Sequence, residues 1–158
     1  MSLPLIYANT IIKHAIDRNT QLSHMKLQKL LYFLYARYAA HHDSALFSNQ
    51  FEPWPYGPVL SDVYEAFKEF GSRSIDKFHK ECDGSISIVD ESSIPFYECL
   101  NEVWLKYGAY NGIELSKLTH EQGTAWHEAW QKKNQFLKWE DIIADGERFF
   151  TTNPNCAC

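Results

Sequence analysis

The stretch MKLQKLLYFLYARYAAH, at residues 25–41, decides the fold of this chain. Its apolar residues recur at the spacing of one helical face. That stripe consists of Leu27, Leu30, Leu31, Leu34 and Tyr38. The remaining faces are apolar too, through Tyr32, Phe33, Tyr35 and Ala36. A helix that is apolar nearly all round belongs in a protein interior, so this segment predicts the central helix of the core, with Ser23 as its N-cap.

Shorter helices are predicted on both sides of the central helix. Apolar spacing and capping signals place them at about residues 4–16, 58–71, 95–107, 112–118, 125–133 and 139–150. Residues 85–88 read SISI after a turn signal and predict a short strand, which needs a partner near Phe78 or in the segment after Phe51. The sequence therefore predicts a mainly α protein: a compact single-domain helical fold of about five to seven helices with a small β element.

An aromatic, proline-rich segment follows the central helix. Residues 51–58 read FEPWPYGP, and three prolines and a glycine in eight residues exclude a helix and predict an extended backbone. Phe51, Trp54, Tyr56 and Pro58 either pack in the core or form a stiff recognition surface, because Trp and Tyr are favoured anchors in interfaces. Both interpretations hold if one face of the segment packs and the other is exposed.

The composition excludes several classes of protein. The 158 residues are 45% hydrophobic and 15% aromatic, which excludes a disordered chain. A net charge of −5 argues against a general nucleic-acid surface and leaves two short basic pairs as the nearest candidates, Lys26 with Lys29 and Lys132 with Lys133. With no apolar stretch long enough to span a bilayer and no export signal, a cytoplasmic protein without a membrane partner is expected.

The cysteines and the C-terminal segment predict no metal site. Reduced thiols are the simplest interpretation of the four cysteines in a cytoplasmic chain, which are Cys82, Cys99, Cys156 and Cys158. The last two are separated by one residue, whereas zinc and redox pairs are usually separated by two. Residues 151–158 are therefore expected to form a flexible tail.

Histidines and hydroxyls in the second half of the chain offer weak catalytic patterns. His120 and His127 each precede a glutamate, but their spacing of seven residues does not match two zinc ligands on one helix. Ser116 and His120 are four residues apart, yet no third partner or nucleophile elbow accompanies them. We expect His120 to bond a nearby backbone carbonyl, and His41 with His42 to complement the dipole at the end of the central helix.

Three ordered blocks of the chain resemble the Panacea domain, a SocA-like family long described as a phage-associated domain of unknown function. Residues 25–33 resemble its Lys-Leu-Gln-Lys-Leu-Leu-Tyr opening, residues 51–59 its Glu-Ala-Trp-x-Tyr-Gly-Pro-Val block, and residues 114–120 its Glu-Leu-Ser-x-x-Thr-His block. Two positions depart from the pattern, since Pro53 replaces the usual Ala and Ala125 replaces the usual Pro. The resemblance assigns residues 1–150 to this domain.

The resemblance implies a helical antitoxin of a two-gene toxin–antitoxin system, which acts by direct protein–protein binding. The implied partner is a small protein toxin encoded nearby, and a SocA-like variant also delivers its toxin to a Clp-type protease. No cofactor, metal, nucleic acid or enzyme activity is expected. The residues expected to bind the partner are Phe51, Trp54, Tyr56, Pro58, His120 and Trp126. Two alternatives stay open: a phage or mobile-element regulatory protein without a toxin partner, and an enzyme that uses His120.

Overall fold

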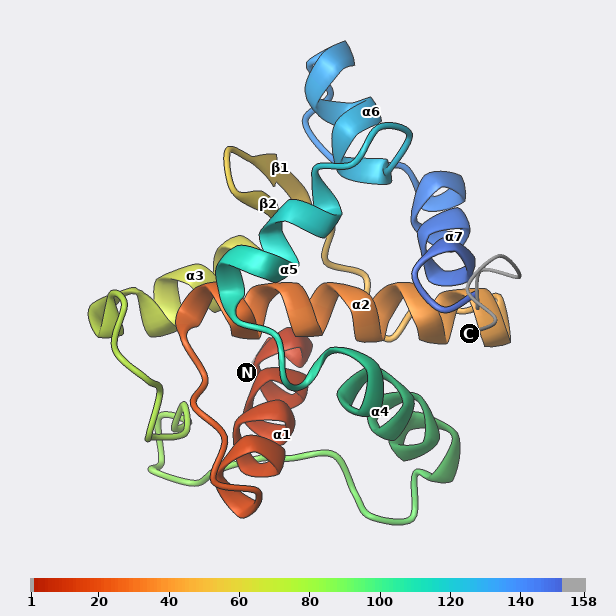
Figure 1. Ribbon diagram of the computed structural model, residues 1–158. Helices are drawn as coiled ribbons and strands as arrows, with labels where there is room; N and C mark the ends of the chain where they lie inside the picture. Colours follow the sequence, from red (N-terminus) through yellow and green to blue (C-terminus); the bar gives the residue numbers. More distant parts are fainter. Residues whose placement is uncertain (1, 152–158) are drawn as a thin grey trace.

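The computed structural model describes residues 2–151, and within them the chain forms seven α-helices, one short 3-10 helix and one two-stranded sheet (Figure 1). The helices are α1 (Leu3–Asp17), α2 (His24–His42), α3 (Ser61–Phe67), η1 (Lys68–Phe70), α4 (Ile94–Tyr107), α5 (Gly112–Thr119), α6 (Ala125–Lys132) and α7 (Trp139–Arg148). Strands β1 (Glu52–Trp54) and β2 (Gly57–Val59) pair as an antiparallel hairpin. The predicted mainly α fold with a small β element is confirmed, whereas the C-terminal segment that carries Cys156 and Cys158 lies outside the described residues, apart from Thr151.

Helix α2 crosses the middle of the molecule, as predicted. Helices α1 and α4 lie on one side of it in Figure 1, and α5 and the hairpin lie on the other, while α7 packs on its C-terminal half. The Ser23 hydroxyl caps the helix by accepting a hydrogen bond from the Lys26 N–H at 3.1 Å. Four leucines of the predicted stripe are buried, namely Leu27, Leu30, Leu31 and Leu34. Coverage from every side explains why all faces of this helix are apolar.

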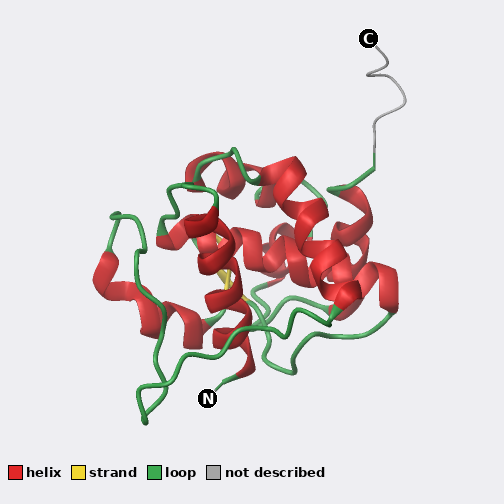
Figure 2. Cartoon of the chain, turned by 90° about the horizontal axis from the view of Figure 1, so that it is seen from below, coloured by secondary structure: helices red, strands yellow, loops and turns green. Residues whose placement is uncertain are grey.

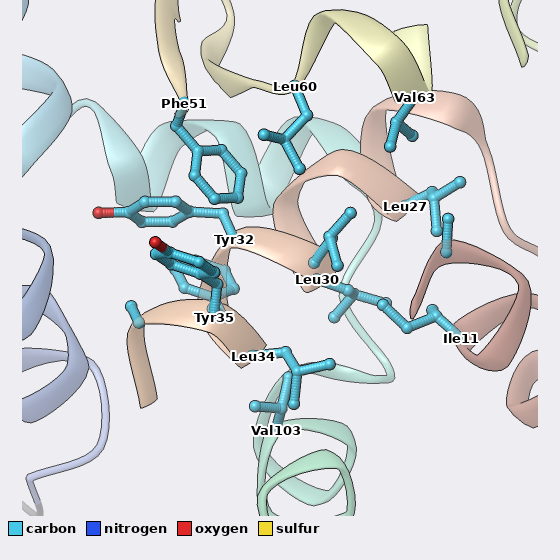
Figure 3. Packing of buried hydrophobic residues seen from close by; sticks show 14 of the residues in the cluster. Ile11, Leu27, Leu30, Tyr32, Leu34, Tyr35, Phe51, Leu60, Val63 and Val103 are labelled. Atoms are coloured by element: carbon cyan, nitrogen blue, oxygen red, sulfur yellow. The ribbon is translucent and has the colours of Figure 1, made fainter. Parts of the chain in front are cut away.

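The core around α2 joins residues from distant parts of the chain (Figure 3). The Phe51 ring meets the Tyr32 ring edge-on, with centroids 5.1 Å apart. On the far side of α2, Leu34 points toward Val103 of α4. Phe51, the residue directly before the hairpin, is therefore fixed in the core.

Helices α2 and α7 approach closely at Gly146. A Cβ atom there would lie 2.1 Å from the carbonyl oxygen of Ala36, so a larger residue cannot be accommodated without moving one helix. Beside this contact, the buried Asp145 carboxylate accepts hydrogen bonds from the Tyr32 hydroxyl and from the Ala125 N–H that begins α6. Burial raises the pKa of Asp145 to about 6. One carboxylate thus ties α2, α6 and α7 together.

The prediction of a strand at residues 85–88 is wrong. The connection between η1 and α4, residues 71–93, contains no strand, and Figure 2 shows loop where that strand was expected. Side chains of α1 take the backbone groups that a ladder would use: Asn9 donates to the carbonyls of His79 (2.9 Å) and Ser87 (3.2 Å) and accepts from the His79 N–H. Thr10 accepts from the Val89 N–H at 2.9 Å. Both paired strands lie instead in the segment after Phe51.

Two further expectations need correction. Helix α3 begins at Ser61 rather than near Pro58, because Pro58 pairs with Pro53 in the hairpin. Lys26 and Lys29 do not form a basic surface patch, because both side chains are buried and donate to backbone carbonyls. The capping box of Asn111 and Glu114 is confirmed. None of the helices in residues 2–151 combines the length and apolar character that crossing a bilayer requires.

Candidate partner-binding site

The hairpin turn is the most prominent aromatic feature of the surface. Trp54 pairs with Gly57, so that Pro55 and Tyr56 form the two-residue tip. Tyr56 has 67% of its surface exposed, whereas the Trp54 ring is half-buried against Tyr64, with centroids 4.8 Å apart. The tip therefore presents one free aromatic side chain and the outer part of a second.

Side chains from α5, α6 and the turn between them hold the backbone of this tip. The Trp126 indole N–H donates to the Trp54 carbonyl at 2.6 Å. His120 Nε2 lies 2.8 Å from the Pro55 carbonyl oxygen, and the Ser116 hydroxyl donates to the Tyr56 carbonyl at 2.7 Å. Three consecutive carbonyls are thus bonded to side chains. A turn held at every residue loses little conformational entropy when it binds a partner.

Two side chains of helix α2 bond the backbone at and just after the second strand of the hairpin. The Lys29 ammonium donates to the Pro58 carbonyl at 3.0 Å. The Gln28 amide donates to the Leu60 carbonyl and accepts from the Leu60 N–H, both at 3.1 Å. Gln28 therefore extends the backbone pairing of the hairpin with a side chain.

Gly57 is required where the strand passes over Lys29. Its φ is +115°, and an added Cβ would lie 2.6 Å from both Lys29 Cε and Thr119 Oγ1. A side chain here is excluded both by the backbone conformation and by the space available. The three sequence blocks singled out above thus meet at one place, because each contributes groups to the same hairpin.

The six residues predicted to bind a partner divide into two groups. Phe51, Pro58 and Trp126 are buried and hold the hairpin in place. Trp54, Tyr56 and His120 reach the surface, with Tyr56 the most exposed of the three. The structure therefore brings all six together around one hairpin but leaves three of them available for contact.

Two hollows flank the exposed Tyr56. One, of about 830 Å³, lies on the α5 side and is lined by Met25, Ile113 and His120 among others. The second, of about 400 Å³, lies between the hairpin, α2 and α3, and is lined by His24, Lys29, Trp54 and Tyr64 among others. Tyr56 and Pro55 line both hollows and form the ridge between them. A partner protein can therefore contact Tyr56 from both hollows at once.

The weak catalytic pattern is used for structure in this arrangement. His120 Nδ1 lies 2.6 Å from the Ser116 carbonyl oxygen rather than the Ser116 hydroxyl, which points at Tyr56 instead. The expectation that His120 bonds a backbone carbonyl is confirmed: each ring nitrogen lies within hydrogen-bond distance of a carbonyl oxygen, and a neutral imidazole donates to one of the two. In residues 2–151, no three His, Cys, Asp or Glu side chains gather as a metal would require.

Sequence reasoning missed the role of three polar residues. Gln28, Lys29 and Ser116 were read as parts of motifs or of a surface patch, yet each bonds the hairpin backbone. The available signal was a pair of polar residues, Gln28 and Lys29, within an otherwise apolar and buried helix. Polar side chains in such a position need a partner, and the proline-rich segment has carbonyls to offer.

Fold and site together define a small helical domain that presents one rigid aromatic turn. The family model described as antitoxin SocA-like, Panacea domain, matches residues 27–127. The chain is also 28% identical over 143 residues to antitoxin SocA of Caulobacter vibrioides (strain NA1000 / CB15N), an alignment that covers 88% of this chain and 69% of that protein. No solved structure matches. The chain belongs to the SocA-like Panacea domain family.

Proposed function

We propose that this chain is an antitoxin that neutralises a small protein toxin by direct binding, with the hairpin turn as its contact surface. The observation that carries this proposal is a turn in which Tyr56 is 67% exposed while its own carbonyl and those of its two predecessors are held by side chains. Family membership supports the role, since the relative from Caulobacter vibrioides is named an antitoxin.

The chemistry of the turn suits protein recognition. Trp54 and Tyr56 offer large apolar area with a polar group each, and such residues dominate the binding energy of many interfaces. Because the backbone is already held, binding does not have to order it. The free surface of this turn is aromatic rather than basic, which favours a protein partner over a nucleic acid.

The test is co-expression with the product of the neighbouring gene. Tyr56→Ala should lower affinity for the toxin by at least about thirtyfold, as expected for an interface anchor, and should abolish protection of the host cell. The melting temperature should stay unchanged, because the Tyr56 side chain is largely exposed. Trp54→Ala should weaken binding too, with a small loss of stability because Trp54 packs on Tyr64.

Leu105→Ala supplies the control. Leu105 is 91% exposed on α4, which lies across α2 from the hairpin (Figure 1), so this variant should bind and protect like the parent. Neutralisation that survives both Trp54→Ala and Tyr56→Ala would move the contact surface away from the turn. A neighbouring gene that is harmless when expressed alone would favour the alternative, a phage or mobile-element regulatory protein without a toxin.

Protease delivery, a non-enzymatic mechanism and a cytoplasmic location are further parts of the proposal, and each needs its own measurement. If the chain delivers the toxin to a Clp-type protease, cells that contain the protease should degrade the toxin faster with this chain than without it. A non-enzymatic mechanism predicts that protection requires at least as much of this chain as of the toxin, because each copy masks toxin by binding and does not turn over. Cytoplasmic location predicts that the chain co-purifies with the soluble cell fraction.

A further inference from the structure

The smaller hollow beside Tyr56 has an unusual chemical character. It has a volume of about 400 Å³, and its walls include Trp54, Tyr56 and Tyr64. Two nitrogen-bearing side chains of α2, His24 and Lys29, contribute to its lining. The lining of the hollow therefore combines aromatic rings with two nitrogen-bearing side chains.

Lys29 is a buried amine without a counterion among the described residues. Lys29 is 1% exposed, and this burial lowers the pKa of its amine to about 7. Among the described residues, no Asp or Glu oxygen lies within 4.0 Å of its ammonium, whose one hydrogen bond goes to the Pro58 carbonyl. An ammonium group has three hydrogens to donate, so its capacity is incompletely used.

His24 adds a second unsatisfied group in the same hollow. The residue is 8% exposed, and its ring stacks on Tyr64 with centroids 5.4 Å apart. Its Nε2 atom is buried and has no hydrogen-bond partner in residues 2–151. Buried polar atoms in folded proteins nearly always have a partner, so this ring nitrogen has a hydrogen-bonding position still open.

We propose that this hollow receives a carboxylate of the toxin, with Lys29 as its ion partner and His24 Nε2 as a second donor. The inference rests on the proposed function and deepens it. A carboxylate has two oxygens and accepts from two donors, while the aromatic walls suit the carbon stem that carries it. The carboxylate can belong to an Asp or Glu side chain or to the C-terminus of the toxin, and the experiment separates these sources.

Proton uptake on binding is the signature of this arrangement. At about pH 8 the Lys29 amine of the free protein is mostly neutral, and pairing with a carboxylate raises its pKa so that it binds a proton. Of the other ionisable groups in the hollow, His24 has a pKa lowered to about 4 by burial, and Lys68 has a pKa raised by its hydrogen bond to Glu65. The Tyr56 and Tyr64 phenols are the remaining ionisable groups of the lining.

The experiment is titration calorimetry of the purified chain with the toxin identified by co-expression. At about pH 8, the binding enthalpy should differ between phosphate and Tris buffers by an amount that corresponds to uptake of close to one proton per complex. Lys29→Met should abolish this uptake and weaken binding by at least about thirtyfold. Tight binding without proton uptake, or uptake that persists in Lys29→Met, overturns the inference and leaves the antitoxin role standing. Absence of binding overturns both.

Two additions keep the test decisive if Lys29→Met fails to fold. Lys68 has an exposed side chain in the lining of the hollow, so Lys68→Glu should repel a carboxylate and lower affinity several-fold. The loss of its exposed ion pair with Glu65 should cost only a little stability. Lys77→Glu, an exposed charge reversal outside the hollow, should bind like the parent, and equal affinities of the two variants contradict the proposal. Amidation of the C-terminus of the toxin abolishes the uptake if the C-terminal carboxylate is the ligand. An Asp→Asn or Glu→Gln change in the toxin abolishes it if a side chain is the ligand.

Discussion

The hairpin and the connection after η1 are both attached to the helices by polar side chains, but at different densities. In the hairpin, bonds from side chains reach the carbonyls of Trp54, Pro55 and Tyr56 in succession. In the connection, the side chains of Asn9 and Thr10 bond the backbone at residues 79, 87 and 89, and most residues between the first two points are exposed. The comparison teaches that the hairpin combines strand pairing with closely spaced anchors, whereas the connection has widely spaced anchors and no strand pairing.

Both segments depend on the same core, and breaking it should have the largest effect. Leu34→Asp or Leu30→Asp places a charge in the fully covered side of α2, where burial costs several kcal/mol, comparable with the ~5–15 kcal/mol stability of a typical domain. We expect loss of the cooperative thermal transition, followed by circular dichroism. Leu105→Asp, on an exposed position of α4, should melt like the parent. A cooperative melt unchanged in the two core variants would show that the core has been assigned wrongly.

The connection should break when Asn9 is lost. Asn9→Leu removes three hydrogen bonds to the backbone of His79 and Ser87 and should cost about 3 kcal/mol, because buried backbone groups lose their partners. Hydrogen exchange should speed up in residues 76–90 and stay slow in the hairpin. Asn101→Leu, at an exposed position of α4, is the matched control. Equal exchange rates in both segments of the Asn9 variant would contradict independent attachment.

Raising the pH should increase the free energy of unfolding through Lys29, the side chain of α2 that bonds the second strand of the hairpin. The pKa of Lys29 falls from 10.5 in the unfolded chain to about 7 in the folded protein, so between these values the unfolded state binds more protons. Stability therefore rises with pH in this window, by about 2 kcal/mol between pH 7 and pH 9. Urea denaturation at several pH values measures the slope. The slope should largely vanish in Lys29→Met, and a slope that is the same in both proteins would assign it to other groups.

A smaller effect is expected from one anchor of the hairpin tip. His120→Phe removes the imidazole that lies within hydrogen-bond distance of the Pro55 and Ser116 carbonyls. Because the half-exposed site lets water replace it, the loss of stability should be about 1 kcal/mol. Faster amide exchange confined to residues 54–57 would locate the effect at the tip. His42→Phe, at an exposed position near the end of α2, should leave that exchange unchanged. Exchange at the tip that stays slow in His120→Phe would show that Trp126 and Ser116 suffice.

No effect at all is expected from metal removal. The described residues gather no set of three metal-ligating side chains, and the hairpin is held by protein donors alone. Incubation with EDTA should therefore leave the melting temperature unchanged. A stoichiometric metal in the purified protein, together with a lower melting temperature after its removal, would overturn this prediction.

Local signals in the sequence were sufficient to locate the helices, apart from the start of α3. The cap at Ser23 and the capping box at Asn111 act within four residues, and the apolar stripe of α2 reports its own burial. The prediction of a strand at residues 85–88 failed because the Ser87 carbonyl accepts a hydrogen bond from Asn9, 78 residues away in the chain, and the Ser85 carbonyl accepts one from the Glu81 N–H. The hairpin contacts are similarly remote, since Trp126 reaches back 72 residues to Trp54. Short patterns carry no information about which distant side chain will satisfy a given carbonyl.

The last described helix completes the enclosure of α2, and this has a consequence for biosynthesis. A ribosome delivers α2 early, but α4, α5 and α7, which cover three of its sides, are made some 50 to 100 residues later. Throughout that interval the nascent chain carries a helix with uncovered apolar surface, the kind of surface that makes incomplete chains prone to aggregation. Gly146 allows α7 to pack closely against Ala36 of α2. The core can therefore be completed only after Gly146 has left the ribosome. Premature termination before Gly146 therefore yields an unprotected central helix rather than a smaller working domain.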